Sequence, residues 1–174
     1  MLAEDKYFHD LNDQELWKRY CGFLDLSTDE FMNIQKKLLT DSIELVSKSV
    51  LGKKIMGNHK PTNIEEFRNV VPLTNYDDYE PYLSEKREDA LALKPAMWCH
   101  SAGRGGNFKW IPHSAESVEM AGRSYMAAMI LAGCSKKGEI KMRPGARILA
   151  ILAPPPYSSG STVGALVKRF SWKV

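Results

Sequence analysis

The clearest pattern of apolar positions lies between residues 27 and 52. The stretch begins with Ser27-Thr28-Asp29-Glu30, in which Ser27 can cap a helix while Glu30 bonds back to the capping residue. Apolar residues then recur at helical spacing. We expect a helix that stops near Gly52 and buries this stripe in the core: Phe31, Ile34, Leu38, Leu45, Val46 and Val50.

Shorter helices are predicted on both sides of this stretch. Asn12 or Asp13 can cap a helix over residues 14–20, with Leu16, Trp17 and Tyr20 on its apolar face. Asn and Thr residues open further capped segments. The remaining predicted helices cover residues 62–69, 74–87, 114–133 and 162–169.

Three segments are predicted as strands. Residues 96–99 and 109–112 form the two arms of a hairpin, and residues 147–153 are an apolar run typical of a buried parallel strand. Residues 170–174 are interpreted as the start of another strand. Strands that alternate with helices indicate an α/β fold with a parallel or mixed sheet, preceded by a helical segment over residues 1–90.

A glycine-rich loop joins the two arms of the hairpin. Gly103, Gly105 and Gly106 lie within four positions, and glycine allows several backbone N–H groups to converge on one anion. Arg104 and Lys109 add positive charge, so a phosphate is the expected guest. The spacing fits neither the Walker loop nor the dinucleotide-binding fingerprint.

This loop resembles the phosphate loop of the adenylate-forming superfamily, which includes acyl- and aryl-CoA ligases, luciferases and plant auxin amido synthetases. The residues that fall in the matching places are Gly105, Lys109, Pro112 and Ser114. The segments before the loop, Glu-Glu-Phe, Val-Pro-Leu-Thr and Tyr-Asp-Asp-Tyr within residues 65–79, are similar in order to those of phenylacetate-CoA ligases and auxin amido synthetases. The three tyrosine rings at 76, 79 and 82 are nevertheless expected to pack rather than to meet a ligand.

The resemblance implies ATP-dependent activation of a carboxylic acid as an acyl-adenylate, followed by transfer to a thiol, such as that of coenzyme A, or to an amine. ATP and Mg²⁺ are the implied cofactors, and residues 91–174 are the implied start of the ATP-binding subdomain. Tyr157, Ser158 and Gly160 are candidates for the acyl pocket. The implied phosphate-binding residues are Ser101, Ala102, Gly103, Arg104, Gly105, Gly106 and Lys109.

Two other functions stay open, because Ala102, Gly103 and Arg104 depart from the glycine and hydroxyl residues usual in this loop. The chain could be a non-catalytic nucleotide-binding module, or a structural remnant whose loop binds nothing. The adenine-binding segment, the acidic Mg²⁺ and ribose residues and the distal catalytic lysine have no counterpart here. We therefore expect a fragment of a longer enzyme, in which an unpaired sheet edge can drive self-association.

Charge is unevenly distributed along the 174 residues. Residues 1–90 hold 12 Lys and Arg against 18 Asp and Glu, a net −6, whereas residues 91–174 hold 12 against 3, a net +9. The basic half suits either a polyphosphate or an acidic segment that covers it. No nucleic acid, membrane or metal site is expected, and three widely spaced cysteines favour the cytoplasm.

Overall fold

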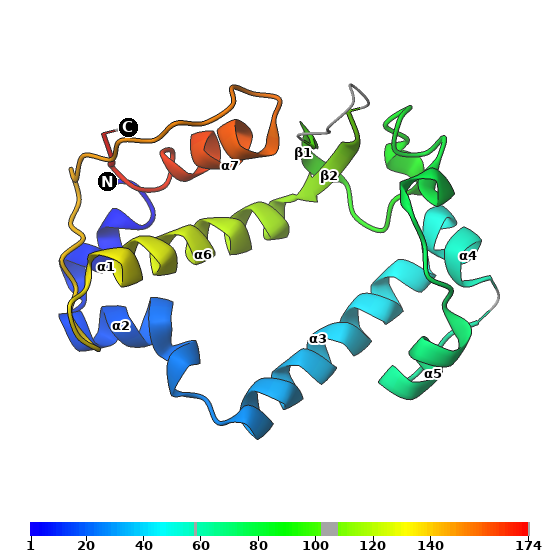
Figure 1. Ribbon diagram of the computed structural model, residues 1–174, viewed down its shortest axis with the longest axis horizontal. Coiled ribbons are helices and arrows are strands. Elements are labelled where there is room, and N and C mark those ends of the chain that lie inside the picture. Colours follow the sequence, from blue (N-terminus) through cyan, green and yellow to red (C-terminus); the bar gives the residue numbers. More distant parts are fainter. Residues whose placement is uncertain (58, 102–107, 174) are drawn as a thin grey trace. The chain divides into compact units, whose positions relative to one another are not determined.

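The computed structural model describes residues 1–57, 59–101 and 108–173 (Figure 1). The chain divides into two compact units. The first unit consists of Met1–Asp25 together with Ala115–Val174, and the second unit consists of Leu26–Ser114. Each unit has its own set of helices, and the hairpin belongs to the second unit.

The first unit is helical. Within it, α6 lies between α2 and α7 (Figure 1). Its helices are α1 (Asp5–Asp10), α2 (Asp13–Cys21) with a following 3₁₀ turn η1 (Gly22–Asp25), α6 (Ala115–Gly133) and α7 (Ser158–Leu166). The buried side chains that form its core are Leu16, Trp17, Tyr20, Cys21, Met126, Ala127, Ile130, Ile140, Leu166, Phe170 and Trp172.

The predicted helix over residues 14–20 is confirmed. The Asn12 side chain accepts the N–H groups of Gln14 at 3.0 Å and Glu15 at 3.1 Å, and the Glu15 carboxylate accepts the Asn12 N–H at 2.9 Å. These bonds satisfy N–H groups that a helix start leaves without partners. The predicted apolar face, which includes Leu16 and Trp17, is buried.

A buried ionic cluster joins the beginning and the end of the first unit. Glu4 is only 2% exposed, and its carboxylate accepts hydrogen bonds from the Arg169 guanidinium at 2.9 Å and from the Tyr20 hydroxyl. The neighbouring Asp5 accepts the backbone N–H of Ser171 at 3.1 Å. A carboxylate can be buried in this way because both of its oxygens have donors.

The second unit contains α3 (Thr28–Ser47), α4 (Val50–Met56) and α5 (Ile64–Val70), followed by the 3₁₀ turns η2 (Tyr76–Tyr79) and η3 (Glu88–Ala90). The antiparallel strands β1 (Pro95–His100) and β2 (Trp110–Ser114) complete it. The hairpin is therefore confirmed, with Cys99 opposite Ile111. The predicted helices at 62–69 and 114–133 are confirmed as α5 and α6, and that at 162–169 is found as α7, earlier in the chain.

The long helix begins as predicted but ends earlier. Ser27 and Glu30 make both bonds of the capping box. The helix then stops at Ser47 rather than near Gly52, because the Ser49 hydroxyl accepts the Gly52 N–H at 2.9 Å and starts α4. A side-chain carbon at Gly52 would lie 1.9 Å from the Val46 carbonyl oxygen, so this tight junction requires glycine.

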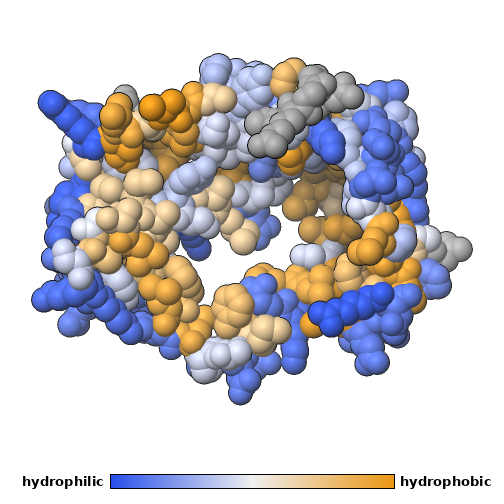
Figure 2. Space-filling model, viewed as in Figure 1, coloured by the Kyte–Doolittle hydropathy of each residue, from blue (hydrophilic) through white to orange (hydrophobic). Residues whose placement is uncertain are grey.

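The prediction that the apolar stripe of this helix lies in the core is wrong. Its six residues, from Phe31 to Val50, are 38–49% exposed, and Figure 2 shows apolar side chains reaching the surface. The residues that α3 buries are Ile43 and, near its end, Ser47. Helical spacing shows which residues share a face, but it does not show which faces have a partner.

Residues 74–87 do not form the predicted helix. Asn75 caps only the short turn η2, and the chain continues in turns as far as Lys86. Pro81 lacks a backbone N–H and disfavours helix at the residue before it, which explains why η2 is not extended.

The prediction of a buried strand at residues 147–153 is also wrong. Leu149 and Ile151 are 97% exposed, and parallel pairing in the described residues is limited to a bridge between Arg147 and Lys173. An apolar run forms a buried strand only where strands lie beside it and layers cover it. The helices and the hairpin are compatible with an α/β fold. The predicted boundary near residue 90, between a helical segment and the start of an ATP-binding subdomain, stays a prediction.

Candidate functional site

The two ends of the glycine-rich loop are held together by Ser101 and Lys109. The Ser101 N–H donates to the Lys109 carbonyl at 2.9 Å, and the Lys109 N–H donates to the Ser101 hydroxyl oxygen at 3.1 Å. These are the two predicted phosphate-binding residues for which the structure gives a position. The other five, residues 102–106, lie outside the described residues.

Tyr76 anchors the strand that follows the loop. Its hydroxyl accepts the Trp110 N–H at 2.9 Å and donates to the Trp110 carbonyl at 3.2 Å. Burial raises the pKa of Tyr76, against the opposing effect of the Trp110 backbone, so the hydroxyl is protonated and can donate at neutral pH. Tyr76 thus positions the backbone directly beside Lys109.

Two ammonium groups lie over aromatic rings at this end of the hairpin. Lys109 Nζ is 5.3 Å from the centroid of the Tyr76 ring, and Lys86 Nζ is 3.3 Å from that of the Trp110 ring. The Lys86 backbone has a φ of 53°, the left-handed region that a residue with a side chain seldom occupies. Aromatic faces attract cations, so these contacts keep positive charge near the loop.

Histidine and aromatic rings surround the end of β1. The His100 ring stacks on Phe108 with centroids 5.2 Å apart and meets Trp110 with centroids 3.7 Å apart. On β2, His113 Nε2 is buried without a hydrogen-bond partner among the described residues. The part of the chain that the structure describes contains no group of three His, Cys, Asp or Glu side chains arranged to hold a metal.

The three candidates for the acyl pocket lie at the start of α7, in the first unit. The Tyr157 N–H donates to the Pro154 carbonyl at 3.0 Å, and the Ser158 carbonyl accepts the Thr162 hydroxyl at 2.7 Å. A side-chain carbon at Gly160 would lie 2.2 Å from the Ala153 carbonyl oxygen, so backbone occupies that space. These contacts give Gly160 a structural role, while acyl binding by the three residues stays a prediction.

The described arrangement is an antiparallel β-hairpin whose loop is closed by Ser101 and Lys109 and flanked by cations. A family model described as the GH3 family N-terminal domain matches residues 21–169. The chain belongs to the GH3 family. This is the family of auxin amido synthetase-like, adenylate-forming enzymes, so the suspected relationship is confirmed.

The match to the GH3 family includes most of both units and the whole loop. This match supports, at the level of the family, the predicted relationship to acid–amine ligases. No curated protein and no solved structure matched the chain. Among the described residues of this GH3 chain, no helix is both long enough and apolar enough to cross a bilayer.

Sequence reasoning missed two residues of the site. The sequence predicts packing of the Tyr76 ring but no hydrogen bond by its hydroxyl, and it gives no signal for Lys86. Tyr76 and Trp110 are 34 positions apart, and no local periodicity indicates such a contact. The composition of the loop itself indicated Lys109 because a cation beside glycines is a local signal.

Proposed function

We propose that this GH3 chain supplies the phosphate-binding part of an enzyme that activates a carboxylic acid with ATP. The acid would attack the α-phosphorus and release pyrophosphate, and the acyl-adenylate would pass its acyl group to an amine or a thiol. The observation that carries this proposal is the family match over residues 21–169, with Lys109 held at the closed end of the loop.

The residue types in and beside the loop suit a polyphosphate. Lys109 offers an ammonium, Ser101 a hydroxyl, and the loop between them a series of backbone N–H groups together with the Arg104 guanidinium. Charged donors make the stronger hydrogen bonds to phosphate oxygens. Mg²⁺ would enter with ATP and would offset part of the negative charge of its phosphates. Nucleotidyl transfer depends chiefly on such positioning and electrostatic stabilisation.

Exchange of radioactive pyrophosphate into ATP in the presence of a panel of carboxylic acids tests the proposal. We expect exchange that requires one class of acid and that falls at least tenfold in Lys109→Ala. Lys94→Ala, which removes an exposed cation just before β1, is the matched control and should retain exchange. The reaction should be measured on the 174 residues and on any longer chain that contains them.

A second function is favoured by the substitutions at residues 102–104, which place Arg104 where a small hydroxyl residue is usual. In that case the chain binds ATP but does not exchange pyrophosphate with any acid. ATP binding without exchange in the longer chain would replace the catalytic proposal by this non-catalytic one. Absence of both ATP binding and exchange would contradict both functions.

A further inference from the structure

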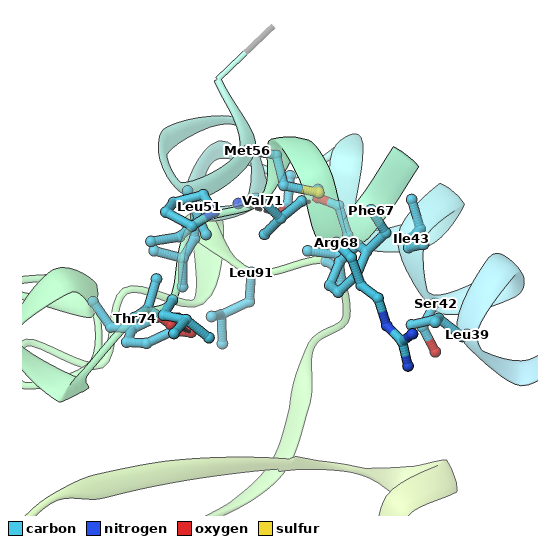
Figure 3. Close-up of a pocket in the computed structure, with 18 residues that line it drawn as sticks. Leu39, Ser42, Ile43, Leu51, Met56, Phe67, Arg68, Val71, Thr74 and Leu91 are labelled. Atoms are coloured by element: carbon cyan, nitrogen blue, oxygen red, sulfur yellow. Dashed lines mark hydrogen bonds between the residues drawn. The ribbon is translucent and has the colours of Figure 1, made fainter. Parts of the chain in front are cut away.

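The second unit contains a cavity that the proposed reaction does not use. Its volume is about 730 Å³, within the range of about 300–1,000 Å³ that is usual for small-molecule sites. All its walls come from residues 39–92, on α3, α4, α5 and the segment that follows them. Figure 3 shows Leu39 and Ile43 from α3, Leu51 and Met56 from α4 and Phe67 from α5 around it.

The walls of the cavity are formed mostly by apolar side chains, and several of their hydroxyl groups are already bonded within the protein. Ser42 donates to the Leu38 carbonyl at 2.7 Å, and Ser49 donates to the Val46 carbonyl at 2.8 Å. The hydroxyls of Thr74 and Tyr79 bond each other at 2.7 Å. A ligand would therefore bind chiefly by placing apolar surface against these walls.

One wall residue carries a full charge. Arg68 extends from α5 in the direction of Ser42 on α3 (Figure 3). It is exposed to solvent, and the described residues include no acidic partner within ion-pair distance of it. The cavity thus combines an apolar interior with one guanidinium, whose planar donors match a carboxylate.

We propose that this cavity binds a single-chain amphiphile with an anionic head group, for which a fatty acid is the simplest representative. The chain would lie against Leu39, Ile43 and Phe67, and the carboxylate would accept hydrogen bonds from Arg68. Binding at this site requires neither ATP nor the glycine-rich loop, so it goes beyond the proposed function and does not rest on it.

Calorimetric titration of the 174-residue chain with decanoate, below its critical micelle concentration and without ATP, tests the site. Decanol and decyltrimethylammonium provide the same chain with a neutral and a cationic head. We expect decanoate to bind most tightly, and Arg68→Met to weaken decanoate about tenfold or more while leaving decanol unchanged. Leu39→Trp, which places a larger side chain at the wall, should weaken decanoate and decanol alike.

Three controls keep a negative result interpretable. Lys53→Met removes a cation of α4 that does not line the cavity and should leave decanoate binding unchanged. Circular dichroism reports whether Arg68→Met and Leu39→Trp are folded. If Arg68→Met is not folded, Arg68→Gln, which also removes the charge, replaces it. Lys109→Ala should bind decanoate normally, which separates this site from the ATP site. Equal decanoate affinity in the wild type and the Arg68 variant, or no binding of decanoate, would overturn the proposal.

Discussion

At the scale of single residues, the buried Glu4 carboxylate depends on Arg169. Arg169→Met would leave the Glu4 carboxylate, which is 2% exposed, with the Tyr20 hydroxyl as its remaining side-chain donor among the described residues. Removing one member of a buried ion pair costs about 3 kcal/mol. Because the Arg169 side chain is 28% exposed, we expect the free energy of unfolding to fall by about 2 kcal/mol. Urea denaturation measures this loss.

The exposed pair formed by Arg123 and Glu119, with a separation of 3.1 Å, provides the matched control on α6. Such exposed pairs contribute less than about 1 kcal/mol. Arg123→Met should therefore change stability little. Equal effects of Arg169→Met and Arg123→Met would contradict the importance of the Glu4 cluster.

Because of Tyr20, we expect the stability of the first unit to fall at alkaline pH. Burial, followed by the hydrogen bond to Glu4, raises the pKa of Tyr20 above its ordinary value of about 10. The folded state therefore holds this proton more tightly than the unfolded state, so the resulting stability is complete below about pH 10 and is lost as pH rises through the folded pKa. Urea denaturation should show that Tyr20→Phe is less stable than the wild type at pH 8, by a margin that shrinks at pH 11. A constant margin would show that Tyr20 titrates alike in both states.

At the scale of the elements, Tyr76 fixes β2 beside the loop. Tyr76→Phe removes both hydrogen bonds to the Trp110 backbone, so we expect the Trp110 amide to exchange its hydrogen about tenfold faster. Tyr79→Phe is a matched control, because its hydroxyl bonds only Thr74 among the described contacts. Amide exchange followed by NMR distinguishes the two variants. Unchanged exchange in Tyr76→Phe would show that the strand holds itself in place.

The junction between α3 and α4 depends on Gly52. Gly52→Ala would place a carbon 1.9 Å from the Val46 carbonyl oxygen, and relieving that clash would outweigh the better helix propensity of alanine. We expect a loss of about 2 kcal/mol in thermal or urea unfolding. Gly22→Ala meets only Lys18 Cγ, at 3.7 Å, and should be neutral. Equal stability of the two variants would refute the close approach at Gly52.

Which elements could be predicted depended on how local their signals were. The caps at Asn12 and Ser27 lie within four residues of the groups they bond, so the sequence located those helix starts correctly. The sequence predicts the start of α5 at residue 62, whereas its cap is Asn63. The apolar run at residues 147–153 required neighbouring strands, and the apolar stripe of α3 required a partner surface. The spacing of residues within a segment does not show whether neighbouring strands or a partner surface are present.

At the scale of the whole molecule, the chain consists of two compact units, and each contains a different set of candidate site residues. The first unit contains the candidate acyl residues, and the second contains the closed end of the glycine-rich loop. The net charge of +9 over residues 91–174 suits either a polyphosphate or an acidic segment that covers this half, and the GH3 match is consistent with the first of these. The cavity lined by Arg68 could not be foreseen, because its walls come from four separate segments.

The central claim is that the hairpin loop binds the phosphates of ATP through Lys109. The most direct test is the dissociation constant of ATP–Mg²⁺, measured by calorimetry for the wild type, Lys109→Ala and the control Lys94→Ala. Loss of one charged hydrogen bond should weaken binding about tenfold to a hundredfold in Lys109→Ala and leave Lys94→Ala unchanged. Equal ATP affinity in all three proteins, or no ATP binding by the wild type, would contradict the claim.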